Sequence, residues 1–443
     1  MLGLSASPTM LREAARPVKT GTLMRVLGLH AEVAGIDVGI GDLVLMGDDR
    51  GPTEPVIGEV VALDETAATV LPYGHLRGRA VGETVRGLGR QLLAPVGHGL
   101  LGRVIDGQGN PIDGGPPLSV ADRVPIHLDP PSAMDRPRVT EPLQVGVRAI
   151  DTMLSCGRGQ RVGILAGSGV GKSSLLSMLL RGTEAPIKVL ALVGERGREV
   201  REFLENDLGP EGRKEAVIIV ATSDEPALVR RNAAFLATRI AEWFRDEGSD
   251  VMLLMDSLTR FAMAQREIGL SAGEVPTARG YTPSVFGLLP TLLERAGTSA
   301  RGSITGFYTV LVEGDDLNDP IGDAARSILD GHISLSRRLA NAGHFPSIDI
   351  LASASRVAGG VNTVEQNQLA QDIRQAMAVF DEARDLIEVG AYSPGSSAEI
   401  DRAIALRPAT TNFLQQPLHQ LSDRNGAWQE LAALLAAVGG PTG

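Results

Sequence analysis

One short stretch of the sequence has the residue types and the spacing of a phosphate-binding loop. Residues 166–173 read Ala-Gly-Ser-Gly-Val-Gly-Lys-Ser, between an apolar run at 162–165 and a largely apolar run at 174–180. This order predicts a strand, a glycine loop and a helix, which together form a P-loop. In a P-loop, consecutive backbone N–H groups and the N-terminus of the helix bind a phosphate. The stretch therefore predicts a nucleotide-binding site.

The chemistry of the side chains gives each residue of this loop an expected role. Lys172 is expected to reach the β- and γ-phosphates of ATP, and Ser173 to offer its hydroxyl to Mg²⁺. Ala166 stands where the strict pattern has glycine, but the phosphate-facing glycines remain. The predicted nucleotide-binding residues are Gly167, Ser168, Gly169, Val170, Gly171, Lys172, Ser173 and Ser174. The alternative is a glycine-rich turn that binds nothing, and the Gly-Lys-Ser ending argues against it.

Two acidic residues follow other apolar runs. Asp256 follows residues 251–255, and Glu195 is the first acid after residues 189–193. Ligands of an open α/β sheet bind at the carboxyl ends of its strands, so both acids are expected near the loop. Asp256 then has the position of a Walker B carboxylate at the magnesium ion, and Glu195 is placed to orient the water that attacks phosphorus. The structural alternative for residues 195–202 is a charged helix start with exposed ion pairs.

Hydrolysis also needs positive charge near the γ-phosphate in the transition state. Arg356 follows another apolar run, and Arg260 lies just past Asp256. The predicted catalytic residues are therefore Glu195, Arg356, Lys172 and Arg260, and the predicted metal ligands are Ser173 and Asp256. The alternative for the two arginines is an ordinary place on the surface.

The elements that must position these residues predict three domains. Short alternating or β-branched runs at 22–29, 42–46, 56–63 and 68–71 predict a small β-barrel or sandwich. Apolar runs that alternate with helical stretches, after a turn-rich connector at 100–117, predict a largely parallel α/β sheet. The expected strands are 161–165, 188–193, 216–221, 251–255, 304–312 and 348–352, and the expected helices 172–180 and 227–246. Helical spacing beyond 363, including 386–402 and 428–437, predicts a helical C-terminal domain.

Composition narrows the possible partners and compartments. The 443 residues carry a formal net charge of −11, and the stretch expected to form the barrel has Tyr73 as its one aromatic residue. Nucleic acid is therefore not an expected partner, because base stacking needs aromatic residues and phosphate binding needs basic surface. The single cysteine, Cys156, suits a reducing compartment and is expected to be a small buried residue. No signal peptide or membrane span is apparent, so the cytoplasm is expected.

Several longer motifs carry a family resemblance. Residues 346–355, Pro-Ser-Ile-Asp-Ile-Leu-Ala-Ser-Ala-Ser, resemble the signature of the hexameric ATPases that include the catalytic subunits of rotary ATP synthases. Within that superfamily, residues 156–161, 280–286, 302–316 and 328–333 are similar to the type III secretion ATPases, above all the flagellar branch. The resemblance covers about residues 21–416. One departure, Gly306-Phe307 in place of a small residue followed by a bulky one, lies in an expected packing strand.

The resemblance implies a RecA-like P-loop NTPase core with an N-terminal β-barrel and a C-terminal helical domain. The expected boundaries are 21–90, 91–360 and 361–443, after a flexible partner-binding segment at 1–20 that the resemblance does not support. Arg356 would be an arginine finger lent to the neighbouring subunit of a hexamer. Phe345 would stack on adenine, and Phe413 could close the same pocket.

The expected activity is ATP hydrolysis that energises flagellar protein export, with ATP and Mg²⁺ bound. Expected partners are a regulator or stator, a stalk protein, export chaperones and substrates, and the membrane export gate, which places the protein peripherally at the cytoplasmic face of the inner membrane. The alternatives are a non-flagellar type III secretion ATPase, a rotary ATP synthase catalytic subunit, and a Rho-like RNA translocase, which RNA-stimulated ATPase activity would reveal. A nonenzymatic nucleotide-binding scaffold is disfavoured by Glu195.

Overall fold

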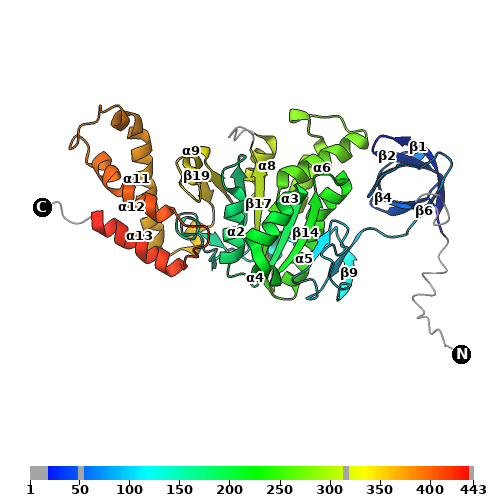
Figure 1. Cartoon of the computed structure of the whole chain (residues 1–443), viewed down its shortest axis with the longest axis horizontal. Helices are drawn as coiled ribbons and strands as arrows, with labels where there is room; N and C mark the ends of the chain where they lie inside the picture. The colour runs from blue at the N-terminus through cyan, green and yellow to red at the C-terminus, as the bar shows by residue number, and fades with distance from the viewer. Residues whose placement is uncertain (1–17, 48–53, 313–318, 439–443) are drawn as a thin grey trace.

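Three parts follow one another along the long axis of the molecule in the computed structural model. A β-barrel lies at one end, an α/β sheet in the middle and a group of helices at the other end (Figure 1). The structure describes residues 18–47, 54–312 and 319–438. The expected partner-binding segment 1–20 therefore lies almost entirely outside the described residues. The three-part fold class expected from the sequence is confirmed, whereas the exact domain boundaries stay predictions.

The N-terminal strands close into a barrel in the order β1-β2-β5-β4-β3-β6. Their bounds are β1 Thr20–Leu27, β2 His30–Ala34, β3 Leu43–Met46, β4 Val56–Leu63, β5 Ala67–Pro72 and β6 Thr84–Gly87. Alternate side chains such as Leu23, Val33 and Val70 point inward and are fully buried. The expected single run at 22–29 is wrong at its end, because Gly28, with φ +54°, reverses the chain into β2.

A nine-stranded sheet forms the middle of the molecule, in the order β19-β18-β12-β17-β15-β13-β14-β8, with β16 paired to β17. Its strands are β8 Val104–Asp106, β12 Arg161–Ala166, β13 Ile187–Glu195, β14 Ala216–Thr222, β15 Asp250–Asp256, β16 Gly297–Thr298, β17 Ser303–Leu311, β18 Gly331–Leu335 and β19 Ile348–Ser355. All six expected strands are confirmed. The apolar runs of β13, β15 and β17 are buried on both faces, as parallel strands between helices require. β19, which pairs antiparallel with β18, is partly exposed.

Three strands of this sheet were not expected from the sequence, and one of them is the two-residue strand β16, which pairs with β17. β8 lies inside the segment predicted to be only a connector, where Val104 and Ile105 pair in parallel with β14. Three residues are too short a run to stand out among the surrounding glycines and prolines. β18 is the third, and it runs parallel to β12 but antiparallel to β19. The direction of β19 decides where Arg356 lies.

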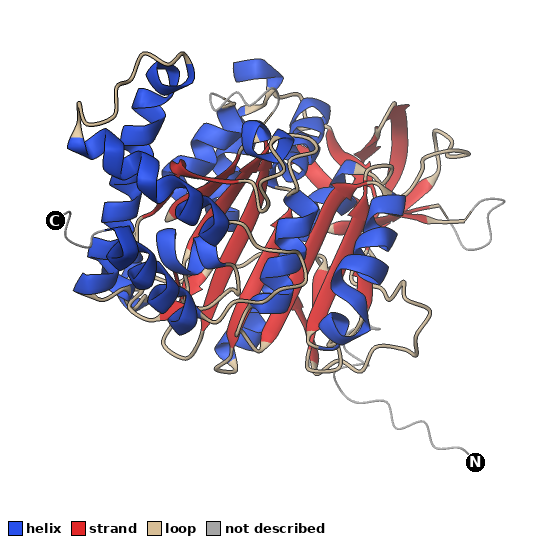
Figure 2. Cartoon of the chain, turned by 60° about the vertical axis from the view of Figure 1, so that its left-hand side comes forward, coloured by secondary structure: helices blue, strands red, loops and turns tan. Residues whose placement is uncertain are grey.

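Helices cover both faces of the sheet (Figure 2). They are α2 Lys172–Gly182, α3 Gly197–Glu202, α4 Gly209–Lys214, α5 Ala227–Asp246, α6 Leu258–Ser271, α7 Pro283–Leu293, α8 Pro320–Ile328 and α9 Arg337–Asn341. The expected helix 227–246 matches α5, which packs on β13, β14 and β15. Two small two-stranded sheets complete this part, β7 Leu93–Val96 with β9 Asp122–Pro125 and β10 Pro142–Leu143 with β11 Cys156–Gly157.

The C-terminal part is helical. It contains α10 Ala358–Val361, α11 Val364–Glu388, α12 Ala398–Leu414 and α13 Arg424–Val438. The expected continuous helical stretch 386–402 is wrong in its middle, because Gly390 and Gly395 adopt positive φ angles and Pro394 lies between them. Ser397 then caps α12 through the N–H of Ile400. None of the helices in the described residues is both long and apolar enough to cross a membrane.

A buried polar cluster joins the barrel to α5. The Glu59 carboxylate, on β4, accepts hydrogen bonds from Tyr73 at 2.5 Å, Arg231 at 2.5 Å and Asn232 at 3.0 Å. All four side chains are at most 9% exposed. A buried charge is tolerated only when it is paired and hydrogen-bonded, so this cluster fixes the barrel against the nucleotide-binding part.

Candidate active site

The predicted P-loop lies between β12 and α2, at the carboxyl edge of the sheet. Gly169 and Gly171 have φ angles of +76° and +89°, which other residues adopt only with strain. The Ser347 hydroxyl, just before β19, donates to the Val170 carbonyl at 2.5 Å and so fixes the loop from the side. Ser168 and Ser173 are exposed, and α2 begins at Lys172, so its N-terminus faces the loop. This geometry suits a phosphate group.

Lys172 lies between the two predicted acids. Its ammonium group is 2.5 Å from an Asp256 oxygen and 3.4 Å from Oε1 of Glu195. Asp256 is held further by the hydroxyl of Thr309, which donates to Oδ1 at 2.6 Å. The acids meet because β13 and β15 are neighbours in the sheet. The structure therefore brings together Lys172, Glu195 and Asp256, as the sequence predicted.

The charges in this cluster shift one another's ionisation. Burial and the neighbouring Asp256 carboxylate raise the pKa of Glu195, and these effects outweigh the attraction of the Lys172 ammonium. Burial alone would lower the pKa of Lys172, but the two carboxylates raise it. A carboxylate with a raised pKa beside a phosphate loop is a suitable proton acceptor for a water molecule.

Thr309 was not predicted as a site residue. It lies inside the buried strand β17, and its side chain is fully buried. Its hydroxyl fixes the orientation of Asp256. A threonine in a strand expected to be buried is a signal that could have found it, because a buried hydroxyl needs a partner.

The Arg260 side chain packs against Gly194, the residue that precedes Glu195. Gly194 has φ +72°, and a side chain at this position would begin 2.8 Å from the Cβ of Arg260. The Arg260 guanidinium contacts the sulfur of Met263 at 3.6 Å, and its buried Nε has no hydrogen-bond partner. Arg260 is thus close to the phosphate side of the site, held there by packing rather than by an ion pair with a described residue.

Arg356 lies at the opposite edge of the sheet from the P-loop. Because β19 is antiparallel to β18, its last residue, Ser355, pairs with Gly331 near the start of β12. The six residues of β12 separate the two edges by roughly 20 Å. Arg356 is exposed and donates to the Arg326 carbonyl at 3.0 Å. The structure does not bring Arg356 to Lys172 of its own chain, and its role towards a neighbouring subunit stays a prediction.

The two predicted adenine-contacting aromatics differ in access. The Phe345 ring is 45% exposed, and a side chain at Gly171 would begin 3.4 Å from it. Phe413 is 2% exposed, with the Arg148 guanidinium 5.6 Å from its ring centre. The two segments meet where the N–H of Gln416 donates to the Phe345 carbonyl at 2.9 Å. Phe345 is therefore free to stack on a ligand beside the P-loop, whereas Phe413 packs in the core.

This chain matches known proteins in both sequence and fold. Residues 146–355 match the ATP synthase alpha/beta family, nucleotide-binding domain, and residues 363–433 match the T3SS EscN ATPase C-terminal domain. The chain is 49% identical to the flagellum-specific ATP synthase of Bacillus subtilis, over 95% of both chains. It is 51% identical to the SPI-2 type 3 secretion system ATPase of Salmonella typhimurium, over 81% of this chain and 83% of that protein.

A solved structure gives the same result. The assembled ATPase EscN from the type III secretion system of enteropathogenic E. coli superimposes with a TM-score of 0.89 at 44% identity, covering 94% of this chain and all of that chain. The P-loop, the two acids at its edge and the three-part fold agree with these matches. The chain therefore belongs to the ATP synthase alpha/beta family, and within it to the group that contains the flagellum-specific and type III secretion ATPases.

Proposed function

We propose that this protein hydrolyses ATP to energise protein export through a flagellar type III secretion apparatus, at sites shared between the subunits of a homohexamer. The observation that carries the proposal is the separation of the catalytic groups on two edges of one sheet. Lys172, Glu195 and Asp256 lie together at one edge, and Arg356 is exposed at the other. In a head-to-tail ring, the edge of one subunit that carries Arg356 faces the edge of the next subunit that carries Lys172.

The proposed ligand is ATP with Mg²⁺. The Ser173 hydroxyl and the Asp256 carboxylate would hold the ion. Magnesium prefers oxygen ligands, and when it is bound to a nucleotide it needs only one or two ligands from the protein. Among the described residues no group of three or more His, Cys, Asp or Glu could form a cage for a metal alone, which fits an ion shared with phosphates. When bound, the ion would neutralise charge on the phosphate oxygens.

Each side chain then has a proposed role. Lys172 binds the terminal phosphates, and Thr309 holds the Asp256 carboxylate in place. Glu195 orients the attacking water and accepts its proton. Arg260 lies beside the backbone of Glu195 and adds positive charge there, and Arg356 of the neighbouring subunit stabilises charge that develops on the γ-phosphate. Phe345 stacks on the adenine ring, and Phe413 supports the segment that carries Gln416.

The flagellar assignment rests on the extent of similarity. The flagellum-specific enzyme of Bacillus subtilis is 49% identical over 95% of both chains, whereas EscN, which covers 94% of this chain, is 44% identical. The proposal places the ring in the cytoplasm, against the cytoplasmic face of the inner membrane. Its proposed partners are a regulator or stator, a stalk protein, export chaperones and substrates, and the export gate. The C-terminal match to EscN favours this role over that of a rotary ATP synthase subunit.

Complementation in two hosts tests the flagellar assignment. The gene is expressed in Bacillus subtilis lacking its flagellum-specific ATP synthase and in Salmonella typhimurium lacking its SPI-2 ATPase. In each host, the recovered activity is expressed as a fraction of the activity that the host's own gene restores. Swimming motility is expected to recover to a larger fraction than SPI-2 secretion does. Lys172→Ala is the matched negative control in both hosts. Recovery of SPI-2 secretion without motility would show that the protein serves a non-flagellar apparatus.

A further inference from the structure

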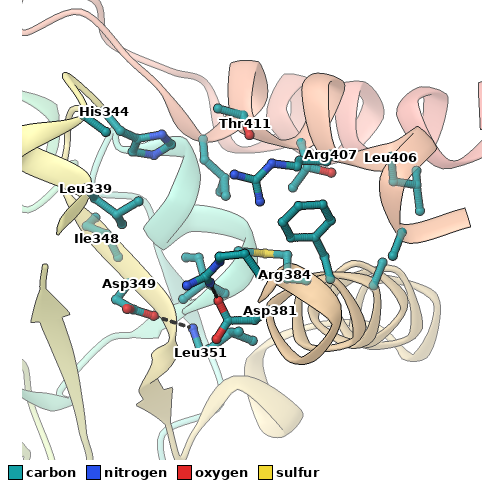
Figure 3. Close-up of a pocket in the computed structure, with 18 of the residues that line it drawn as sticks. Leu339, His344, Ile348, Asp349, Leu351, Asp381, Arg384, Leu406, Arg407 and Thr411 are labelled. Atoms are coloured by element: carbon teal, nitrogen blue, oxygen red, sulfur yellow. Dashed lines mark hydrogen bonds and ion pairs between the residues drawn. The ribbon is translucent and has the colours of Figure 1, made fainter. Parts of the chain in front are cut away.

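A second cavity lies between the sheet and the C-terminal helices, apart from the P-loop. Its volume is about 250 Å³, just below the usual range of small-molecule sites, which is roughly 300 to 1,000 Å³. Figure 3 shows side chains from α9, β19, α11 and α12 around it. Apolar walls come from Leu339, Ile348, Met377, Phe380, Leu406 and Leu414. The cavity is therefore suited to the body of a small apolar or amphipathic molecule.

Three arginines from three different helices surround the cavity. Arg338 belongs to α9, Arg384 to α11 and Arg407 to α12. Arg384 forms an ion pair with Asp381, one of two acids in the lining. The other, Asp349, accepts the N–H groups of Leu351 and Ala352 at 3.1 and 3.0 Å. Both acids are thus already engaged within their own elements.

Two of the arginines keep positive charge without a carboxylate partner. Among the residues that the structure describes, neither Arg338 nor Arg407 forms an ion pair. The Arg407 guanidinium lies over the Phe380 ring, 3.8 Å from its centre, and so adds a cation to an apolar wall. Burial and the repulsion of Arg384 and Arg338 lower the pKa of Arg407, and these effects outweigh the attraction of Glu388, so positive charge predominates around the guanidinium.

We infer that this cavity is a binding site for a small organic anion with a flat apolar body, its acidic group held by Arg407 and Arg338 and its body against Phe380. Guanidinium groups bind carboxylate, sulfonate and phosphate oxygens through paired N–H donors. An anion here would relieve the repulsion between the arginines, and its apolar body would cover a wall that is now open to water.

The cavity is connected to the nucleotide site by covalent structure. β19 begins at its wall and ends next to Arg356, and the loop from His344 to Ser347 runs from its wall to the P-loop. A bound molecule would contact the sheet and the helical part at once. The site is nevertheless distinct, because Lys172, Glu195 and Asp256 are absent from its lining. The inference therefore stands or falls independently of the proposed export function.

Two small probes test the site on the full-length protein, with the nucleotide site filled by saturating MgADP. Naphthalene-2-sulfonate carries the acidic group and the flat body, and 2-naphthol is its neutral counterpart at pH 7. Isothermal titration calorimetry should detect one sulfonate per chain and at least about tenfold weaker binding of the naphthol, the loss expected without charge-assisted contacts. Equal binding of both probes would overturn the inference.

Variants locate the bound probe. Arg407→Gln should weaken sulfonate binding about tenfold, because one charge-assisted contact is lost. Arg402→Gln, an exposed position on the same helix outside the cavity, should leave it unchanged. Phe380→Leu should weaken binding of both probes through loss of the flat wall. Unchanged affinity in Arg407→Gln, or an equal loss in Arg402→Gln, would assign the binding to another surface.

Discussion

At the scale of single residues, the centre of the site is one lysine between two carboxylates. The Lys172 ammonium lies 2.5 Å from Asp256 and 3.4 Å from Glu195. A bound phosphate would compete with these two carboxylates for the ammonium group. Asp256 has Thr309 as a second partner, whereas the Glu195 carboxylate contacts only Lys172 among the described residues of the cluster. Glu195 is thus the acid with more freedom to receive a proton from water.

The first prediction separates the roles of these residues. Glu195→Gln should lower ATP turnover by at least about 100-fold, the effect of losing a general base, and leave MgATP affinity unchanged. Lys172→Ala should weaken nucleotide binding itself, because it removes a charge from the phosphate site. Turnover measured under saturating ATP and binding measured by titration distinguish the two. Glu202→Gln, at an exposed position at the end of α3, is the matched control and should keep normal turnover. Normal turnover in Glu195→Gln would refute the assignment of Glu195 as the general base.

The second prediction concerns pH. The pKa of Glu195 is raised above the ordinary value of 4.5, so the carboxyl takes up its proton at a higher pH than an exposed glutamate does. Because the ionised form is the base, kcat/KM should fall as pH decreases through this raised pKa, by about tenfold per unit. Circular dichroism at each pH checks that the fold persists. A kcat/KM that stays constant down to pH 4.5 would show that no such base is needed.

At the scale of elements, the sequence predicted the parts of the site that depend on parallel strands. Asp256 and Glu195 were located correctly because each follows a long apolar strand, and such strands end at the same edge. The same reasoning could not place Arg356, since the direction of β19 depends on its pairing with β18 rather than on its composition. β8, at three residues, and the turn at Gly28 were missed because neither leaves a periodic signal.

The cluster of Glu59, Tyr73, Arg231 and Asn232 gives the third prediction. Glu59→Gln leaves the buried Arg231 charge without its carboxylate, and breaking a buried pair costs about 3–5 kcal/mol. The barrel should therefore unfold at a clearly lower denaturant concentration. Glu32→Gln removes a surface pair with Arg25 in the same barrel, where about 0–1 kcal/mol is expected. Equal midpoints for the two variants would show that the cluster does not hold the barrel in place.

At the scale of the whole molecule, the three parts form a row in which the catalytic groups occupy two edges of the middle part (Figure 1). One chain alone holds Lys172, Glu195 and Asp256 but keeps Arg356 roughly 20 Å away. The site proposed above therefore combines residues from two copies of the chain. The sequence indicated such sharing only through the family resemblance, because nothing in the residues around Arg356 shows which subunit they serve.

The most direct test of this shared site is the ATPase rate of rings mixed from two inactive variants. Arg356→Ala subunits keep a complete P-loop, and Lys172→Ala subunits keep the arginine. If the site is shared, equal mixing should restore roughly a quarter of wild-type activity, because about one interface in four then combines an intact loop with an intact arginine. Light scattering confirms that the mixed rings assemble. A mixture no more active than the two variants measured separately, in rings of normal size, would contradict a shared site.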